Sequence, residues 1–530
     1  MRFAASLFAL LLAACATTGV PTPAERAQQW WTDVATLADD DMEGRLTGSA
    51  GYRRAADYVV SRFRAIGLEP AGSDGFLQPI AFEEQFVAAA QSKASLVRAG
   101  GAGTRLEIPG DLIIGSGAGP RPAAVDAPLV FIGYGLHIPE AGHDDFANID
   151  LRGKIAVVVG GGPANSSGAL KSHARSQRAR LLEERGAVGL IALTTPKAVE
   201  IPWARTMGLS SQGGMYFSDP ALREIRTEFV SGSFNPARSE MLFAGSGRSF
   251  ADIAALADAS RPVPGFDLKQ SLRASIATRR TSASSPNVVA LLRGSDPSLR
   301  AEHVVLSAHL DHLGVGEPVD GDRIFNGAMD NAAGVGALLD IARMLKGRRV
   351  APKRSILFVI VTAEEKGLLG SRYFTLRPTV PRRSIVANLN FDMALPIIPL
   401  TSVIALGAEE SSLGADARAV GEALGLPLVP DPLPERNSFI RSDQYSFIRE
   451  GVPALAFKFG FAKGSPEAAV EQAWRSSRYH APSDDPAQPV ERADAVRLND
   501  FVAALALRVA DAPGRPQWQP QSFFRRFAKE

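Results

Sequence analysis

The sequence predicts an α/β fold, with a mixed, mostly parallel sheet flanked by helices and a β-rich domain inserted into it. From residue 287 onward, strand-like runs alternate with helix-like segments, which is typical of a sheet with helices on both faces. Residues 96–270 differ, because short β-rich runs there are separated by Gly, Pro and Asp turns. Sheets of the first kind bind ligands at the carboxyl ends of their strands, so we expect binding or catalytic residues there.

The elements follow from periodicity. Residues 30–45 and 49–68 suggest helices, the second with apolar side chains at helical spacing and an end at Gly67. The inserted segment suggests strands at 127–135 and 154–162 and a helix at 176–187. In the last part of the chain we expect helices at 334–346 and 413–425, and strands at 287–294, 303–310, 354–363, 384–393 and 452–459.

Composition narrows the classes of function. The chain has 530 residues and a net charge of +2, with no basic arm and no interleaved basic and aromatic stripe. Such a chain has no global field that would recruit nucleic acid, so we expect no nucleic-acid partner. The sequence leaves the oligomeric state open.

The N-terminus has the features of an export signal. Arg2 precedes an apolar run from Phe3 to Leu12 that is too short to span a bilayer. The following Leu-Ala-Ala-Cys resembles the lipobox of bacterial lipoproteins, which implies a lipid anchor on Cys15, the only cysteine. Ala16 replaces the aspartate that commonly retains lipoproteins in the inner membrane, so we expect an exported protein held at the outer membrane and facing the periplasm. The alternative is a plain signal peptide and a secreted protein, with Cys15 incidental.

Ligand-type side chains stand at the ends of the predicted strands. His309 and Asp311 end one strand, Asp330 precedes a helix, and Glu364 with Glu365 ends the next strand. Asp392 and His480 follow in later segments. Imidazole and carboxylate groups together suit zinc or a similar divalent ion, although each residue alone has an ordinary structural explanation.

The other histidines are assigned structural roles. We interpret His303 and His312 as structural, and we expect His137, His143 and His173 on the surface of the inserted segment. The sequence also has no Gly-x-Ser-x-Gly elbow, and its sole cysteine lies in the export region. A serine or cysteine nucleophile is therefore not expected.

Taken together, these motifs resemble the M28 family of zinc metallopeptidases. The resemblance is carried by His309-Leu-Asp311, Met329-Asp330-Asn331, the stretch TAEEKGLLGS ending at Ser371, Asn390-Phe-Asp392 and Tyr479-His480. Their order and spacing are also similar, and the stretch from Asp40 to Leu68 resembles the opening helices of the family. The β-rich segment, with NIDLRGKIAVVVGG, looks like a protease-associated (PA) domain.

The resemblance implies a zinc exopeptidase fold and a division into segments. These are a lipoprotein signal peptide at 1–15, an N-terminal part of the peptidase domain at 25–95, a PA-like insertion at 96–270, the catalytic zinc peptidase domain at 275–513 and a C-terminal tail at 514–530.

The resemblance also implies roles for the site residues, with two Zn²⁺ ions per chain. Asp330 would bridge the ions, with His309 and Asp392 on one and Glu365 and His480 on the other. Glu364 would be the general base that takes a proton from a zinc-activated water, and Tyr479 would donate to the oxyanion. Asp311, two residues beyond His309 in an extended strand, would orient its imidazole.

The leading hypothesis is an exported zinc aminopeptidase that hydrolyses N-terminal residues of peptides. A glutaminyl cyclase or a carboxypeptidase for acidic residues on the same fold is the enzymatic alternative, and the latter needs a basic pocket that Arg436 and Arg441 could supply. A metal-free binding protein is the non-enzymatic alternative.

Overall fold

The computed structural model describes residues 21–98, 101, 103–115, 119–199 and 201–529. The predicted signal peptide and Cys15 lie outside these residues. Within the described ranges, no helix has the length and apolar character needed to cross a bilayer.

The central sheet contains all five strands predicted for the last part of the chain. Its order is β11-β2-β14-β18-β15-β19-β21-β20, with β1 beside β14. The strands β18, β15, β19 and β21 are parallel to one another, as predicted, whereas β14, β2, β11 and β20 pair antiparallel at the flanks. The bounds are β1 Glu69–Pro70, β2 Leu77–Val87, β11 Gly214–Phe217, β14 Thr278–Leu292, β15 His303–His309, β18 Ser355–Val361, β19 Ile385–Asn390, β20 Val403–Leu406 and β21 Ala454–Phe459.

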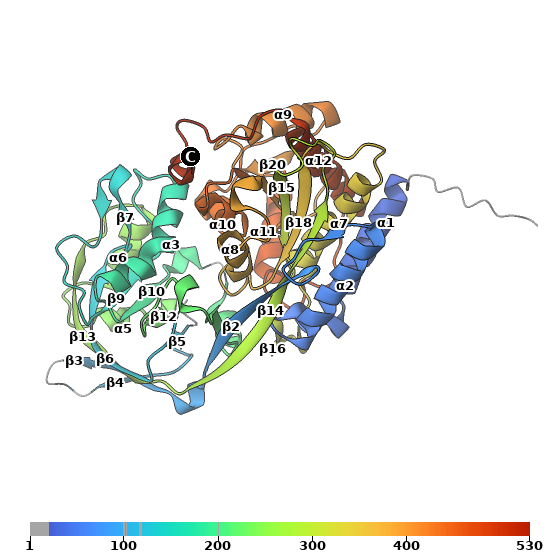
Figure 1. Cartoon of the computed structure of the whole chain (residues 1–530). Helices are drawn as coiled ribbons and strands as arrows, with labels where there is room; N and C mark the ends of the chain where they lie inside the picture. Colours follow the sequence, from blue (N-terminus) through green and yellow to red (C-terminus); the bar gives the residue numbers. More distant parts are fainter. Residues whose placement is uncertain (1–20, 99–100, 102, 116–118, 200, 530) are drawn as a thin grey trace, which may run out of the picture.

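Helices cover both faces of this sheet because its central strands are apolar on both sides. In β18, Ile356, Phe358 and Ile360 join the large core with α1, α2, α7 and α12, whereas Leu357, Val359 and Val361 face α8 and α10 (Figure 1). The bounds of the helices in this part are α1 Pro23–Leu37, α2 Ala50–Ile66, α7 Ala333–Lys346, α8 Leu369–Leu376, α9 Leu413–Leu424, α10 Gln444–Arg449, α11 Pro466–Ser477 and α12 Arg492–Asp511.

The helix predicted over residues 30–45 begins and ends earlier than expected, because α1 starts at Pro23. It ends at Leu37, and a 3₁₀ segment follows at Asp40–Arg45. The side chain of Asp39 accepts a hydrogen bond from the backbone N–H of Asp41 and so starts a new turn. Gly44 takes a positive φ of 60°, which a helix interior does not allow. This break turns Arg45 into the protein interior.

The inserted segment builds a second sheet, ordered β4-β3-β13-β6-β9-β10-β12-β5. The predicted strands at 127–135 and 154–162 and the predicted helix at 176–187 correspond to β6, β9 and α3. The bounds are β3 Lys93–Arg98, β4 Thr104–Leu106, β5 Leu112–Ile114, β6 Ala124–Ile132, β9 Ile155–Val159, β10 Gly189–Leu193, β12 Val230–Phe234, β13 Gly265–Ser275, α3 Gly168–Glu184, α4 Trp203–Leu209, α5 Glu240–Phe243 and α6 Phe250–Asp258. Short hairpins are formed by β7 His137–Ile138 with β8 His143–Asp144 in this segment, and by β16 Gly314–Val319 with β17 Asp322–Phe325 in the later part of the chain.

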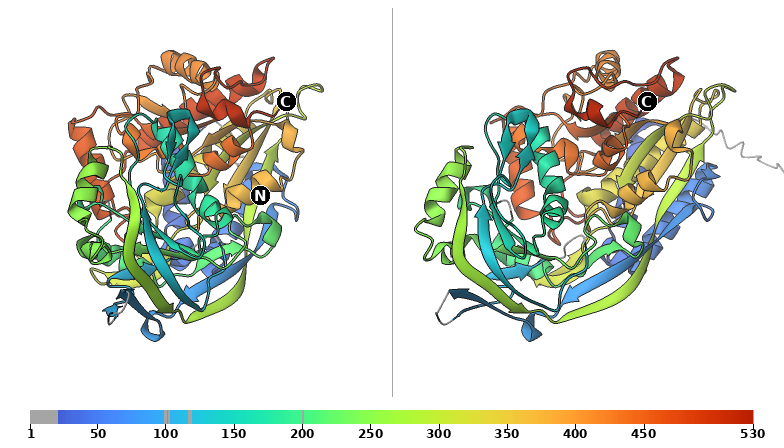
Figure 2. Two further views of the ribbon diagram at one scale, coloured as in Figure 1. Left: turned by 90° about the vertical axis from the view of Figure 1, so that its left-hand side faces the viewer. Right: turned by 60° about the vertical axis from the view of Figure 1, so that its left-hand side comes forward.

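The two sheets are joined by the long antiparallel pair of β2 and β14, which runs between them along one side of the molecule (Figures 1 and 2). The insertion also reaches back: β11 pairs with β2 in the central sheet, and α4 lies near β16. The inserted segment therefore contacts the rest of the chain at two further places, the edge strand β2 of the central sheet and the β16 hairpin that follows β15.

The C-terminal tail packs against the molecule. Trp518 and Phe524 are buried in an apolar cluster with residues of α10. His173 of α3, expected on the surface, is instead half-buried there, with its Nδ1 2.7 Å from the Tyr445 hydroxyl and its ring against Phe523 and Phe527.

Candidate active site

The carboxyl ends of β15, β18 and β19 bring the predicted ligand residues together. His309 is the last residue of β15, and its Nε2 lies 3.3 Å from Asp330 Oδ1 and 3.4 Å from Asp392 Oδ1. Asp392 follows β19, which is parallel to β15. These three side chains form one compact group whose ligand atoms all lie within 4.8 Å of one another.

A second group forms around the other oxygen of Asp330. The Nε2 atom of His480 lies 3.4 Å from Asp330 Oδ2 and 3.4 Å from Glu365 Oε2. His312, interpreted as structural from the sequence, also belongs here: its Nδ1 is 2.8 Å from Glu365 Oε1 and 4.0 Å from Asp330 Oδ2. The ring of His312 is therefore part of the site, either as a ligand or as the group that positions Glu365.

The chemistry of this cluster fits divalent metal ions. Carboxylates that meet in the protein interior repel one another unless cations neutralise them. Burial opposes ionisation of Asp330, yet hydrogen bonds with His309 and His480 hold the pKa of its carboxyl well below the usual value. The buried Nε2 of His312 has no hydrogen-bond partner among the described residues. Imidazole nitrogens and ionised carboxylates are the donors that zinc takes in proteins.

The position of Asp330 depends on the loop before α7. Gly327 has φ +61°, and a Cβ there would lie 2.6 Å from the ring of His312, so the turn requires glycine. The buried carboxylate of Asp484 accepts hydrogen bonds from the backbone N–H groups of Met329 and Asp330 at 3.0 Å. Asp484 thus connects this loop to the segment that carries His480.

Asp311 acts differently from its predicted role. The Nδ1 atom of His309 is 3.0 Å from the backbone carbonyl oxygen of Asp311, not from its carboxylate. β15 ends at His309, so the alternation of an extended strand does not continue to Asp311. The buried carboxylate instead accepts hydrogen bonds from the backbone N–H groups of Glu364 at 3.0 Å and Glu365 at 3.2 Å. Asp311 therefore positions the turn that carries both glutamates.

Glu364 lines the same pocket as the ligand residues. Burial, and then the nearby carboxylates of Asp392 and Glu365, raise the pKa of Glu364 well above its ordinary value, against the attraction of His309. A carboxylate with a raised pKa is a stronger base, which is the property required of a group that takes a proton from water.

Tyr479 also lines this pocket, with its ring centroid 3.9 Å from that of His480. Its segment is tied to the insertion, because Arg205 of α4 donates hydrogen bonds to the backbone carbonyls of Tyr479 at 3.1 Å and Ser476 at 3.2 Å. The insertion thus helps to fix the segment that carries His480.

The fully buried Arg45 is a site-supporting residue that the sequence analysis missed. Its guanidinium donates hydrogen bonds to backbone carbonyls of four residues: Leu37 at 2.6 Å, Asn326 at 2.6 Å, Leu310 at 2.8 Å and Gly327 at 2.9 Å. Leu310 follows His309, and Gly327 begins the Asp330 loop. Burial lowers the pKa of Arg45 to about 10. The only available signal was a charged residue after a glycine in a helix-breaking stretch, which does not distinguish a buried arginine from an exposed one.

The comparisons with known proteins agree with this geometry. Residues 287–506, which include every predicted site residue, match peptidase family M28. This part of the chain is therefore similar to M28 peptidase domains. The chain is 28% identical over 196 residues to the aminopeptidase YwaD of Bacillus subtilis, covering 36% of this chain and 39% of that protein. The chain is also 27% identical over 260 residues to a probable leucine aminopeptidase 2 of Aspergillus oryzae, covering 46% and 48%.

The chain spans less than half the length of these curated relatives. Among solved structures, an aminopeptidase from Aneurinibacillus sp. strain AM-1 aligns with a TM-score of 0.55 at 18% identity, covering 94% of this chain and 97% of that one. At this identity the likeness supports the fold, and it extends beyond residues 287–506 to 94% of the chain.

Proposed function

We propose that the chain is a zinc-dependent aminopeptidase that hydrolyses N-terminal residues of peptides. The observation that carries this proposal is the buried Asp330, whose two oxygens are shared between an imidazole–carboxylate group around His309 and another around His480. The relatives that the chain resembles are named as aminopeptidases, which supports the exopeptidase reaction.

Two zinc ions are the proposed cofactor, with Asp330 between them. His309 and Asp392 would hold one ion, while Glu365 and His480, with His312 beside them, would hold the other. When bound, zinc supplies Lewis acidity that polarises a peptide carbonyl and lowers the pKa of water.

The residues of the chain supply the remaining steps. Glu364 accepts a proton from the attacking water and later delivers it to the leaving amine, and Asp311 holds its backbone in place during both transfers. The Tyr479 hydroxyl donates a hydrogen bond to the carbonyl oxygen as negative charge develops there. The carboxylates of Glu364 and Asp392 also favour a free ammonium group at the N-terminus of the substrate.

Paired substitutions of the adjacent glutamates test this assignment. We expect Glu364→Gln to retain bound zinc, measured by elemental analysis, and to lose at least about 100-fold in kcat for aminoacyl anilides. Glu365→Gln should lose zinc. A Glu364→Gln variant that retains most of its activity would rule out this base, and a purified wild-type protein that binds no zinc would rule out the mechanism.

We further propose that the protein is exported and lipid-anchored through Cys15, at the outer membrane, and that the inserted segment is a PA-like domain. The signal-like N-terminus supports export. Labelling cells with radioactive palmitate should mark the wild-type chain, and Cys15→Ser should remove both the label and the membrane association. A wild-type chain that stays unlabelled and soluble outside the cell would favour a secreted form instead.

A further inference from the structure

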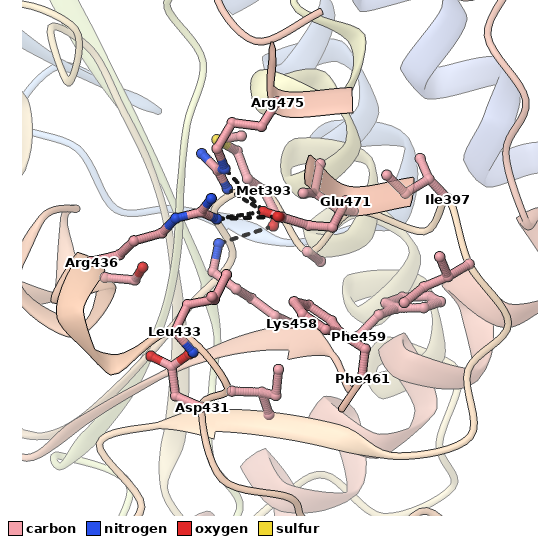
Figure 3. A pocket seen from close by; sticks show the side chains of 15 residues that line it. Met393, Ile397, Asp431, Leu433, Arg436, Lys458, Phe459, Phe461, Glu471 and Arg475 are labelled. Carbon is pink, nitrogen blue, oxygen red and sulfur yellow. Dashed lines mark hydrogen bonds and ion pairs between the residues drawn. The ribbon is translucent and has the colours of Figure 1, made fainter. Parts of the chain in front are cut away.

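Next to the metal-ligand cluster lies a second pocket whose floor is apolar and whose entrance is cationic. It is bordered by Ile397, Phe459 and Phe461 on the apolar side (Figure 3). It shares Met393, Arg436, Ser438, Lys458 and Arg475 with the pocket that holds the ligand residues. A substrate whose reacting carbonyl lies at the metal ligands can therefore extend a side chain past these shared residues.

Three of the cations come from different elements and point toward one place. Arg436 belongs to a short 3₁₀ turn, Lys458 to β21 and Arg475 to α11 (Figure 3). Both arginines bind the same carboxylate: Glu471 Oε1 accepts from Arg436 Nη1 at 2.9 Å and from Arg475 Nη2 at 2.8 Å. One negative charge thus serves two guanidinium groups, and a positive charge remains.

Lys458 adds to this excess. Its ammonium donates a long hydrogen bond of 3.4 Å to the Met393 carbonyl, and no carboxylate of the described side chains lies within 4.0 Å of it. Burial, together with Arg475, lowers the pKa of Lys458. The carboxylates of Asp392, Glu471 and Asp431 oppose this shift, but none of them forms a close ion pair with the half-buried Lys458, so an incoming anion would be stabilised there.

A fourth cation stands at the mouth of the site. Arg441 is exposed and lines the pocket of the ligand residues, with a hydrogen bond of 3.5 Å to the Arg436 carbonyl. The described carboxylates on the apolar side are Glu471 and Asp431, and an oxygen of Asp431 already accepts from the Leu433 N–H at 2.9 Å. Outside the proposed metal ligands and the proposed base Glu364, four cations therefore face two carboxylates.

We infer that this pocket binds a carboxylate of the substrate, so that the enzyme prefers peptides carrying a negative charge close to the scissile bond. This inference rests on the proposed peptidase function and names its substrate class. The carboxylate has two sources, which are the side chain of an N-terminal Asp or Glu and the free C-terminus of a very short peptide. The apolar floor accommodates the methylene groups that precede the charge.

The test compares substrates of equal size and different charge. With the zinc-loaded enzyme, we expect kcat/KM for Glu-p-nitroanilide to exceed that for Gln-p-nitroanilide by about tenfold or more, the effect of one charge-assisted hydrogen bond. If the C-terminal carboxylate is the source, Ala-Ala should be preferred over Ala-Ala-amide and the two anilides should be alike. Hydrolysis of N-acetyl-Ala-Glu would also support the carboxylate site, but with carboxypeptidase polarity.

Substitutions locate the preference. Lys458→Met should bring the Glu/Gln ratio, or the Ala-Ala/Ala-Ala-amide ratio, toward one, and Arg441→Gln, at an exposed position that folding does not depend on, should lower it as well. Lys463→Met is the matched control, because Lys463 is an exposed lysine just beyond the same strand; it should leave the ratio unchanged.

A measurement without turnover separates this inference from the proposed function. Calorimetry should show tighter binding of L-glutamate than of L-glutamine, lost in Lys458→Met. If neutral substrates are hydrolysed with no preference for a carboxylate, and glutamate binds no better than glutamine, the carboxylate site is refuted while the peptidase function stands. If nothing is hydrolysed but glutamate binds through Lys458, the peptidase function is refuted while the carboxylate site stands.

Discussion

The carboxylate of Asp484 provides the sharpest test of how the fold holds the proposed metal ligands. Its Oδ2 accepts the N–H of Asp330 at 3.0 Å and that of Met329 at 3.1 Å, while its Oδ1 accepts the N–H of Met329 at 3.0 Å and Gln488 Nε2 at 2.6 Å. We predict that Asp484→Asn, which changes neither size nor shape, destabilises both the protein and its hold on zinc.

The magnitude follows from these contacts. An asparagine oxygen can replace only one carboxylate oxygen, so the amide NH₂ meets either the Asp330 N–H or the Gln488 amide, both of which are donors. One hydrogen bond to a charged acceptor is lost and one buried donor is left without a partner. Such a loss destabilises a protein by about 2–4 kcal/mol. Because the loop positions Asp330, zinc affinity should also fall by about 10- to 100-fold.

Two measurements check this prediction, with the neighbouring aspartate as a control. The free energy of unfolding of the metal-free protein comes from urea denaturation, and zinc affinity comes from competition with a chelator. Asp485→Asn makes the same chemical change at a more exposed position, where the side chain accepts only the Ala487 N–H at 2.7 Å, and should alter stability by no more than about 0.5 kcal/mol. If the two variants unfold and bind zinc alike, Asp484 does not hold the ligand loop.

Three further predictions concern residues outside the ligand set. Arg45→Met leaves four backbone carbonyls without their donor and should destabilise the protein by about 3–5 kcal/mol in urea denaturation. Arg205→Ala removes the link between α4 and the His480 segment and should weaken zinc binding by about tenfold in chelator competition, with little change in unfolding. Burial, and then nearby arginines, lower the pKa of His173 from 6.5 to about 4, so the folded protein binds fewer protons than the unfolded chain between these values. Stability is therefore complete above pH 6.5 and falls by at most about 3 kcal/mol as the pH drops toward 4, and His173→Gln should flatten this part of the curve.

The controls use residues in similar settings. Arg54→Met changes an arginine of the same region whose side chain is 44% exposed, and it should alter stability by less than about 0.5 kcal/mol. A zinc affinity unchanged in Arg205→Ala would mean that α4 only touches the His480 segment. A pH dependence that persists in His173→Gln would assign the loss of stability at acid pH to other groups.

The sequence contained enough to predict the central sheet and most of the residues that the fold brings together at the candidate site. Apolar runs such as 355–361 are buried on both faces, and their continuous apolar, β-branched composition predicts a central strand. The side chains that follow such parallel strands must meet at one edge of the sheet. His309, Glu365 and Asp392 converge for this reason, and Asp330 and His480 join them from loops next to α7 and α11. The interpretation failed where a strand ended sooner than its pattern suggested, as at Asp311.

By itself, then, the sequence determined which residues form the central strands, the motifs that resemble those of the M28 family, and the chemical types of the proposed ligands. These features depend on local pattern and on spacing along the chain. Only the tertiary structure decided what surrounds them. Arg45, Asp484 and Arg205 act on loops far away in the chain, and His312 joins the site because its loop folds back over Glu365. The cations beside the ligands likewise come from separate elements, so the electrostatic character of the pocket exists only after folding.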